Sequence, residues 1–289
     1  MDTCLQLVDS RLRGNDGKET VTIFKAIPKS VYICLLLPAL VLLVSAMQSM
    51  DGHAVDLHQV LSGSTATHWL GTDALGRDIL SRLAEGIGLS FSVAVSVITV
   101  CAVIGISVGM VAAWLGGWVD SVLMRFVDIV LSFPGILLAI ALAAVLGPGV
   151  ENLIFALAAV GWVGFARLTR AQVLSLRHAP YIEAAIASGQ DTVHIAFKHL
   201  LPNIAAPLLI EASFGLAAVM IGEAGLSFLG IGIQPPDASL GTMIREGSQL
   251  MLVAPMQVFY PGLMLFLLVM SANIAGDALR DYWDVRSKR

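Results

Sequence analysis

Six long runs of apolar residues constrain this chain more than any other feature of its sequence. A helix needs roughly 20 apolar residues to cross the hydrocarbon core of a bilayer. Runs of about that length lie at residues 31–47, 87–114, 122–146, 153–173, 205–221 and 256–275. Hydrophobic residues make up 57% of the chain and charged residues 13%, whereas soluble domains have about 45–50% and 25%. We therefore expect an all-α integral membrane protein with six transmembrane helices.

The lysines and arginines predict how these helices cross the membrane. Cytoplasmic loops carry an excess of positive charge. With the N-terminus inside, 14 of the 17 lysines and arginines fall in cytoplasmic segments, and only Arg77, Arg82 and Arg245 fall outside. We therefore expect both termini in the cytoplasm. The net charge of −4 gives no indication of a nucleic-acid partner.

Glycines and prolines inside the predicted spans do not argue against them. Neighbouring helices can satisfy the backbone groups that such residues free, so we expect Pro134 to be tolerated within the span 122–146. Small residues such as Gly161 and Gly164 are expected to let helices pack closely. The paired prolines Pro235 and Pro236 exclude helix and predict an extended loop.

A polar segment rich in small residues separates the fourth and fifth runs; we call residues 174–203 the central polar segment. Its Glu-Ala-Ala-Ile-Ala stretch at 183–187 favours helix, with Pro180 near the start, where proline is tolerated. Gly189 supplies the positive φ that ends such a helix. A second short helix is expected over residues 192–201, and Pro202 is expected to stop it. The pattern predicts a helix–turn–helix outside the bilayer.

Residues of this segment carry a family resemblance. Glu183-Ala184-Ala185, followed by Gly189, Leu201 and Pro202 at fitting spacings, resembles the EAA loop of ABC-importer permeases. In that family the loop is the socket for an ATPase subunit, and Glu183 would face a basic partner residue. His199 stands where the family usually has Ile, but the peptide-transporter branch commonly shows His-x-Leu-Pro-Asn.

A second signature narrows the resemblance. Residues 70–82, which we call the motif segment, look like the LGTDxxGRDxxSR pattern of the second permease subunit of dipeptide, oligopeptide and nickel importers. The matching residues include Gly71, Thr72, Asp73, Gly76, Arg77 and Asp78. Residues 170–174, 225–236 and 276–281 also fit, although Trp283 and Val285 depart from the last pattern. The similarity covers about residues 25–289.

The resemblance implies the type I ABC importer permease (MetI-like) fold with cytoplasmic EAA coupling helices. The expected organisation is a cytoplasmic tail over 1–30, a first transmembrane helix over 31–47 and an external segment over 48–86. A permease core over 87–278 contains the coupling loop at about 174–203, and a cytoplasmic tail follows over 279–289. The location implied is the bacterial inner membrane, with multiple passes.

The implied function is that of a permease subunit in a binding-protein-dependent importer of di- or oligopeptides. Its implied partners are a second homologous permease, two ABC ATPases, an extracytoplasmic substrate-binding protein and the lipid bilayer. Close relatives handle glutathione and nickel as well. The residues that contact the substrate are not identified by any pattern in this sequence.

No catalytic role is expected for this chain. It contains no G-x-x-x-x-G-K-[ST], H-E-x-x-H or G-x-S-x-G pattern. ATP and Mg²⁺ would therefore be bound by the partner ATPases, and we expect no cofactor in this chain. His53 and His58 lie in the external segment and could contact a metal. Exposed loop histidines are more often simply solvated, so no metal site is expected.

Acidic residues within membrane spans are expensive and indicate function. Glu223 and Ser227 match the family segment Glu-Ala-x-Leu-Ser-Phe-Leu-Gly and are candidates for a gate, whereas Glu211 has no family counterpart and is a candidate for the pathway. An alternative function is a proton-coupled secondary transporter that uses Glu211 and Glu223 as a relay. That class often shows inverted repeats, which this sequence lacks. Copurifying ATPases would distinguish the two functions.

Overall fold

The computed structural model describes Leu36, Ala39, Leu40, Leu43 and residues 52–287. The predicted tail 1–30 lies outside the described residues, and so does nearly all of the predicted first span, 31–47. The described chain is helical, and its only β-bridge joins Thr72 to Asp78. Its elements are η1 (Leu57–Gln59), α4 (Ile79–Leu115), α5 (Gly117–Leu131), α6 (Gly135–Leu146), α7 (Val150–Leu176), α8 (Pro180–Ala187), α9 (Thr192–Ile195), η2 (Ala196–Leu200), α10 (Leu201–Phe228), α11 (Leu240–Ser248) and α12 (Met256–Ser287).

Four helices of the described chain are long and apolar enough to cross a membrane. They are Ile79–Leu115, Val150–Leu176, Thr192–Phe228 and Met256–Asp281, and each contains one of the predicted runs. The bent pair α5–α6 makes a fifth crossing if the two helices together form one span. Several apolar spans in one chain are the pattern of a multi-pass membrane protein. The count of six stays a prediction, because the first run lies outside the described residues.

The predicted span over 122–146 is broken near Pro134 into two helices, α5 and α6. The chain breaks between Leu131 and Gly135, and the axes of α5 and α6 differ by 84°. Pro134 lies at the N-cap of α6, where its φ is −58° and its ψ is +117°. Proline lacks an N–H and disfavours helical backbone in the residue before it. The helix is therefore not continuous across Pro134. Helix α5 ends before this proline and α6 begins after it.

The prediction that Pro202 stops a helix is wrong. Residues Thr192–Phe228 form one continuous helical run, in which Pro202 lies within the first turn of α10. The preceding turn, η2, is a π-turn, and the N–H of Leu201 bonds to the carbonyl of Ala196. At this change of hydrogen-bond register the helix tolerates the missing N–H of a proline. The central polar segment is thus joined rigidly to a predicted membrane span.

Three further boundaries differ from expectation. Helix α4 begins at Ile79, eight residues before the apolar run, because Asp78 caps its N-terminus. Helix α12 continues to Ser287, through most of the predicted C-terminal tail. The short helix α11 was not predicted; a capping box between Ser239 and Thr242 begins it. As expected, no helix forms at Pro235 and Pro236.

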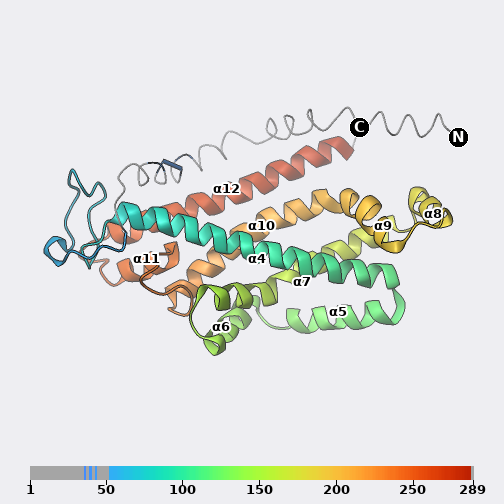
Figure 1. Ribbon diagram of the computed structural model, residues 1–289, viewed down its shortest axis with the longest axis horizontal. Coiled ribbons are helices and arrows are strands. Elements are labelled where there is room, and N and C mark those ends of the chain that lie inside the picture. Colours follow the sequence, from blue (N-terminus) through green and yellow to red (C-terminus); the bar gives the residue numbers. More distant parts are fainter. Residues whose placement is uncertain (1–35, 37–38, 41–42, 44–51, 288–289) are drawn as a thin grey trace.

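Close packing of α4 against α7 forms the centre of the molecule. A Cβ atom at Gly105 would lie 2.4 Å from the carbonyl oxygen of Trp162, and one at Gly109 would lie 2.4 Å from that of Ala166. Small residues allow such backbone approach between membrane helices. Figure 1 shows α8 and α9 at one end of the molecule, whereas the loops that precede α4 lie at the other. Helix α4 runs between the two ends.

Replacing Gly109 with valine is expected to destabilise the chain by about 1–3 kcal/mol, as overpacking does elsewhere. The reason is that the new Cβ would meet the backbone of α7. Thermal unfolding of the purified chain in detergent measures the change. Gly88→Val is the matched control, because Gly88 is a glycine of the same helix with open space at its Cβ position. Equal stability of the two variants would contradict the packing described.

Candidate functional site

The central polar segment folds as the predicted helix–turn–helix. Pro180 occupies the first turn of α8, and Gly189 follows that helix with φ +76°. The side chain of Asp191 accepts a hydrogen bond from the N–H of Val193 and so caps α9. These local signals are sufficient to fix the turn. The two helices lie at the tip of the molecule (Figure 1).

One face of this segment is anchored in the core. Ile182, Ala185, Ile195 and Leu200 are buried among the apolar residues of the molecule. Ala185 therefore packs α8 against the core. Only its exposed neighbours on α8 can contact a partner. The buried side chains pack the inner face of the segment against the core.

The opposite face is exposed and partly apolar. It includes Glu183, Ala184 and Ile186 of α8. Val193 is 60% exposed and Phe197 is 68% exposed, although both are large apolar side chains. The segment thus leaves charged and apolar side chains uncovered.

His199 fastens the turn to the helix that follows it. Its Nε2 lies 3.0 Å from Oε1 of Gln190, and its ring packs edge-on against that of His194. The amide of Asn203 donates to the carbonyl of His199 at 2.6 Å. Leu201 is half-buried and Pro202 is exposed at the start of α10. His199 therefore holds the segment together, and Gln190 is its partner that the sequence did not reveal.

An ion pair near this end ties α5 to α7. The Nε and Nη2 atoms of Arg170 donate to the two carboxylate oxygens of Asp120 at 2.5 and 2.6 Å. Arg177 donates to the carbonyl of Ala113 at the end of α4. A two-pronged contact between guanidinium and carboxylate also fixes orientation. The C-terminal end of α7 is therefore held by contacts to both α5 and α4, where the central polar segment begins.

The motif segment lies at the other end of the molecule, and most of its residues are buried. Gly71 and Gly76 have φ values of +83° and +71°, which favour glycine. The hydroxyl of Thr72 donates to the carbonyl of Gln59. One oxygen of Asp73 accepts from the N–H groups of Leu75 and Arg77. These contacts fold the segment into tight turns just before α4.

The other oxygen of Asp73 joins a cluster of four charged side chains, which we call the charge cluster: Asp73, Arg77, Arg82 and Glu246. Asp73 accepts from Arg77 at 2.7 Å and from Arg82 at 2.6 Å. Glu246 accepts from the same two arginines at 3.1 and 2.7 Å. The cluster thus pairs two buried cations with two carboxylates, and it attaches α11 to the start of α4. The sequence did not reveal Glu246.

Asp78 starts α4. Its Oδ2 accepts from the N–H and the hydroxyl of Ser81, both at 2.8 Å. Its Oδ1 lies 3.0 Å from Nδ1 of His68. Asp78 is 2% exposed, so it acts as a buried helix cap. All six predicted residues of the motif segment therefore lie together, and the polar ones among them make structural contacts.

The gate candidates Glu223 and Ser227 are buried together on α10. The hydroxyl of Ser227 donates to Glu223 Oε1 at 2.8 Å and also accepts from the N–H of Ile233. The hydroxyls of Ser90 and Ser239, which the sequence did not single out, lie beside the same carboxyl group. Glu211 is elsewhere, half-buried against Gly164 of α7. Twelve residues of helix separate Glu211 from Glu223, a rise of about 18 Å.

Comparisons with known proteins give one consistent family. Residues 105–289 match the model of the family described as "Binding-protein-dependent transport system inner membrane component". The chain is 41% identical over 228 residues to the dipeptide transport system permease protein DppC of Alkalihalophilus pseudofirmus, which covers 79% of this chain and 75% of the relative.

Two other relatives are named for different substrates. The glutathione transport system permease protein GsiD of Pectobacterium atrosepticum is 39% identical over 81% of this chain and 77% of its own. The nickel transport system permease protein NikC of Escherichia coli K12 is 38% identical over 88% and 94%. An inward-facing structure of the MetNI methionine ABC transporter matches with a TM-score of 0.55 at 21% identity, over 69% of this chain and 95% of that one. That likeness shows the fold.

Asp73→Asn is expected to destabilise the chain by about 3–5 kcal/mol at neutral pH, because removing one partner of a buried ion pair leaves charge uncompensated. Burial opposes ionisation of Asp73, but the backbone N–H groups of Arg77 and Leu75 and the guanidinium groups of Arg77 and Arg82 outweigh it. The pKa of Asp73 therefore lies below its ordinary value of 3.8.

The stability that a carboxylate of lowered pKa supplies is fully present above its ordinary pKa and disappears as pH falls through its folded pKa. The unfolding midpoints of wild type and Asp73→Asn should therefore differ most at neutral pH and converge in acid. Glu151→Gln, which changes an exposed carboxylate at the start of α7, serves as the control. A constant difference at every pH would contradict the assignment.

Proposed function

The chain belongs to the family of binding-protein-dependent transport system inner membrane components, and we propose that it is a subunit that carries di- or oligopeptides. It is the permease of a binding-protein-dependent ABC importer with an all-helical fold like that of the MetNI permease. The choice of peptide rests on the dipeptide relative at 41% identity. Glutathione and nickel relatives of similar identity make this choice the first one to test.

The central polar segment is the proposed docking site for an ATPase subunit. The observation that supports this proposal is that the segment has one buried face and one exposed face. Ile182 and Ile195 are buried in the core, while Glu183, Val193 and Phe197 stay exposed. A surface of this kind offers an apolar contact and a negative charge for a basic residue of the partner. Glu183, Ala184, Gly189 and Pro202 are its exposed predicted residues, supported by Ala185, His199 and Leu201.

Movement of the docked segment would reach the membrane helices directly. Helix α7 ends at Leu176, only a few residues before α8, and α9 continues through η2 into α10. A rigid body that joins two spans transmits a partner's closure to both of them. When the ATPases close on ATP, the helices would tip from inward-open to outward-open, and hydrolysis would reset them. Glu223 and Ser227, buried where α10 meets α4, are the proposed elements of the gate.

The proposed orientation puts the central polar segment in the cytoplasm and the motif segment at the outer face. Both termini would then be cytoplasmic. ATP and Mg²⁺ belong to the two ABC ATPases, so this chain itself performs no covalent chemistry. A second, homologous permease completes the pathway, and an extracytoplasmic binding protein delivers the substrate. The motif segment and α11 would form part of the surface that the binding protein contacts.

The alternative, a proton-coupled transporter, needs a relay from Glu211 to Glu223. The rise of about 18 Å between them on one helix is too long for direct transfer. Glu211 lies against Gly164 of α7, whereas Glu223 lies near Ser90 of α4. The structure offers no observation that favours this second function.

Glu183→Lys is expected to prevent ATPase binding or coupling while leaving the helices folded, because it reverses an exposed charge of the proposed docking site. Copurification of the ATPases with the tagged permease pair measures binding, and ATP hydrolysis measures coupling. Glu151→Lys is the matched control, since it reverses an exposed glutamate in the first turn of another helix. Normal binding and normal coupling in Glu183→Lys would overturn the docking proposal.

The substrate is tested by ATP hydrolysis of the reconstituted permease–ATPase complex with its binding protein. Dipeptide, a longer peptide, glutathione and a nickel chelate are supplied in turn. We expect a several-fold stimulation by a peptide-loaded binding protein and none by the other two ligands. Stimulation by glutathione or nickel alone would support the importer function but overturn the assignment of peptide as the substrate.

A further inference from the structure

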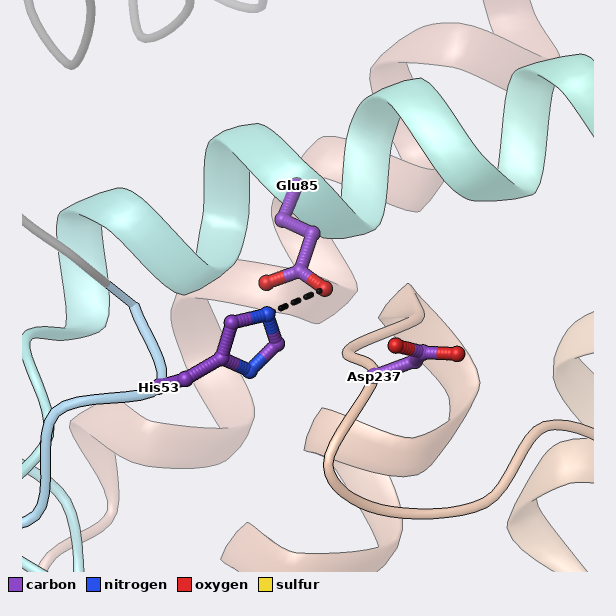
Figure 2. A group of neighbouring side chains, drawn as sticks. All are labelled: His53, Glu85 and Asp237. Atoms are coloured by element: carbon purple, nitrogen blue, oxygen red, sulfur yellow. Dashed lines mark ion pairs between the residues drawn. The ribbon is translucent and has the colours of Figure 1, made fainter.

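A second group of polar side chains lies near the start of α4, separate from the charge cluster. His53 comes from the segment before η1, Glu85 from the second turn of α4, and Asp237 from the loop between α10 and α11. Figure 2 shows the three side chains side by side. One nitrogen or oxygen atom from each lies within 4.8 Å of the other two. Three segments that are distant in sequence thus present an imidazole and two carboxylates at one point.

Among the described residues, neither Glu85 nor Asp237 forms an ion pair with a lysine or arginine. Glu85 and Asp237 place two carboxylates close together, and like charges at short range repel each other. In the described part of the chain, the cations of the charge cluster pair with Asp73 and Glu246. Glu85 has His53 as its ion-pair partner. A divalent cation would neutralise both carboxylates at once.

One distance within the group matches the spacing of two ligands of a metal ion. Nε2 of His53 lies 3.4 Å from Oε1 of Glu85, which is longer than the usual hydrogen-bond range. Two ligands of one tetrahedral ion lie about 3.4 Å apart when each bond is about 2.1 Å. The N–H of Ala238 donates to the same carboxylate at 3.2 Å. Such a contact orients a carboxylate in the way that outer contacts orient metal ligands.

We propose that His53, Glu85 and Asp237 bind one divalent transition-metal ion, of the class of Zn²⁺, Ni²⁺, Co²⁺ or Mn²⁺. The imidazole nitrogen separates this class from Ca²⁺ and Mg²⁺, which take oxygen ligands. The side chains of His53 and Glu85 are 43% and 28% exposed, so an ion can enter and water can fill its remaining positions. The ion would tie the segment before η1 and the α10–α11 loop to α4. This site is independent of the proposed transport function.

The test is metal binding by the full chain, purified in detergent, freed of any histidine tag and treated with a chelator. Titration calorimetry with Zn²⁺ should give one ion per chain, and Zn²⁺ should raise the unfolding midpoint. His53→Gln and Asp237→Asn should each weaken Zn²⁺ binding at least tenfold. His58→Gln is the matched control, because His58 is an exposed histidine five residues away and outside the group. It should leave the affinity unchanged. Ca²⁺ should bind much more weakly than Zn²⁺.

Three results would overturn the site. They are no saturable Zn²⁺ binding by the wild type, unchanged affinity in both His53→Gln and Asp237→Asn, or equal loss in His58→Gln. Equal unfolding midpoints in chelator would show that the variants are folded. If His53→Gln fails this check, Asp237→Asn decides, because Asp237 is exposed in a loop.

Discussion

The close approach of α4 to α7 is the contact on which the rest of the structure depends. Apolar burial gives little preference between helix and lipid inside a membrane, so association relies on van der Waals packing between close backbones. Gly105 and Gly109 provide that approach because their missing Cβ atoms leave room for the backbone of α7. Helix α4 begins at the motif segment, and α7 leads into the central polar segment. Their contact therefore joins the two ends of the molecule into one body.

The two ends are built in opposite ways, and this difference supports their proposed roles. At one end, charged side chains are turned inward: Asp73, Arg77 and Arg82 are at most 6% exposed. Here the buried ion pairs join α11 to the start of α4. At the other end, Glu183 and Phe197 remain on the surface. The proposed importer needs both features: one end with fixed geometry and another end with a surface open to a partner.

Local signals in the sequence predicted the features that depend on neighbouring residues alone. Gly189 ends one helix and a second begins at Thr192, as expected, because turn preferences act within a few residues. The break at Pro134 and the continuity through Pro202 show the limit of such reasoning. Proline restricts the backbone at both positions, but at Pro202 a preceding π-turn absorbs the restriction. The role of Glu246 could not be predicted from local sequence, because its partner Arg82 lies 164 residues away in the chain. Ser90 and Ser239 likewise reach Glu223 only after folding.

The most direct test of an ATP-driven importer is substrate uptake by proteoliposomes that contain both permeases and both ATPases, with a loaded binding protein outside. ATP is enclosed in one preparation, and a proton gradient without ATP is imposed on another. We expect uptake with enclosed ATP and none with the gradient alone. Uptake driven by the gradient without ATP would contradict this expectation, because Glu211 and Glu223 would then have to carry protons despite their separation along α10.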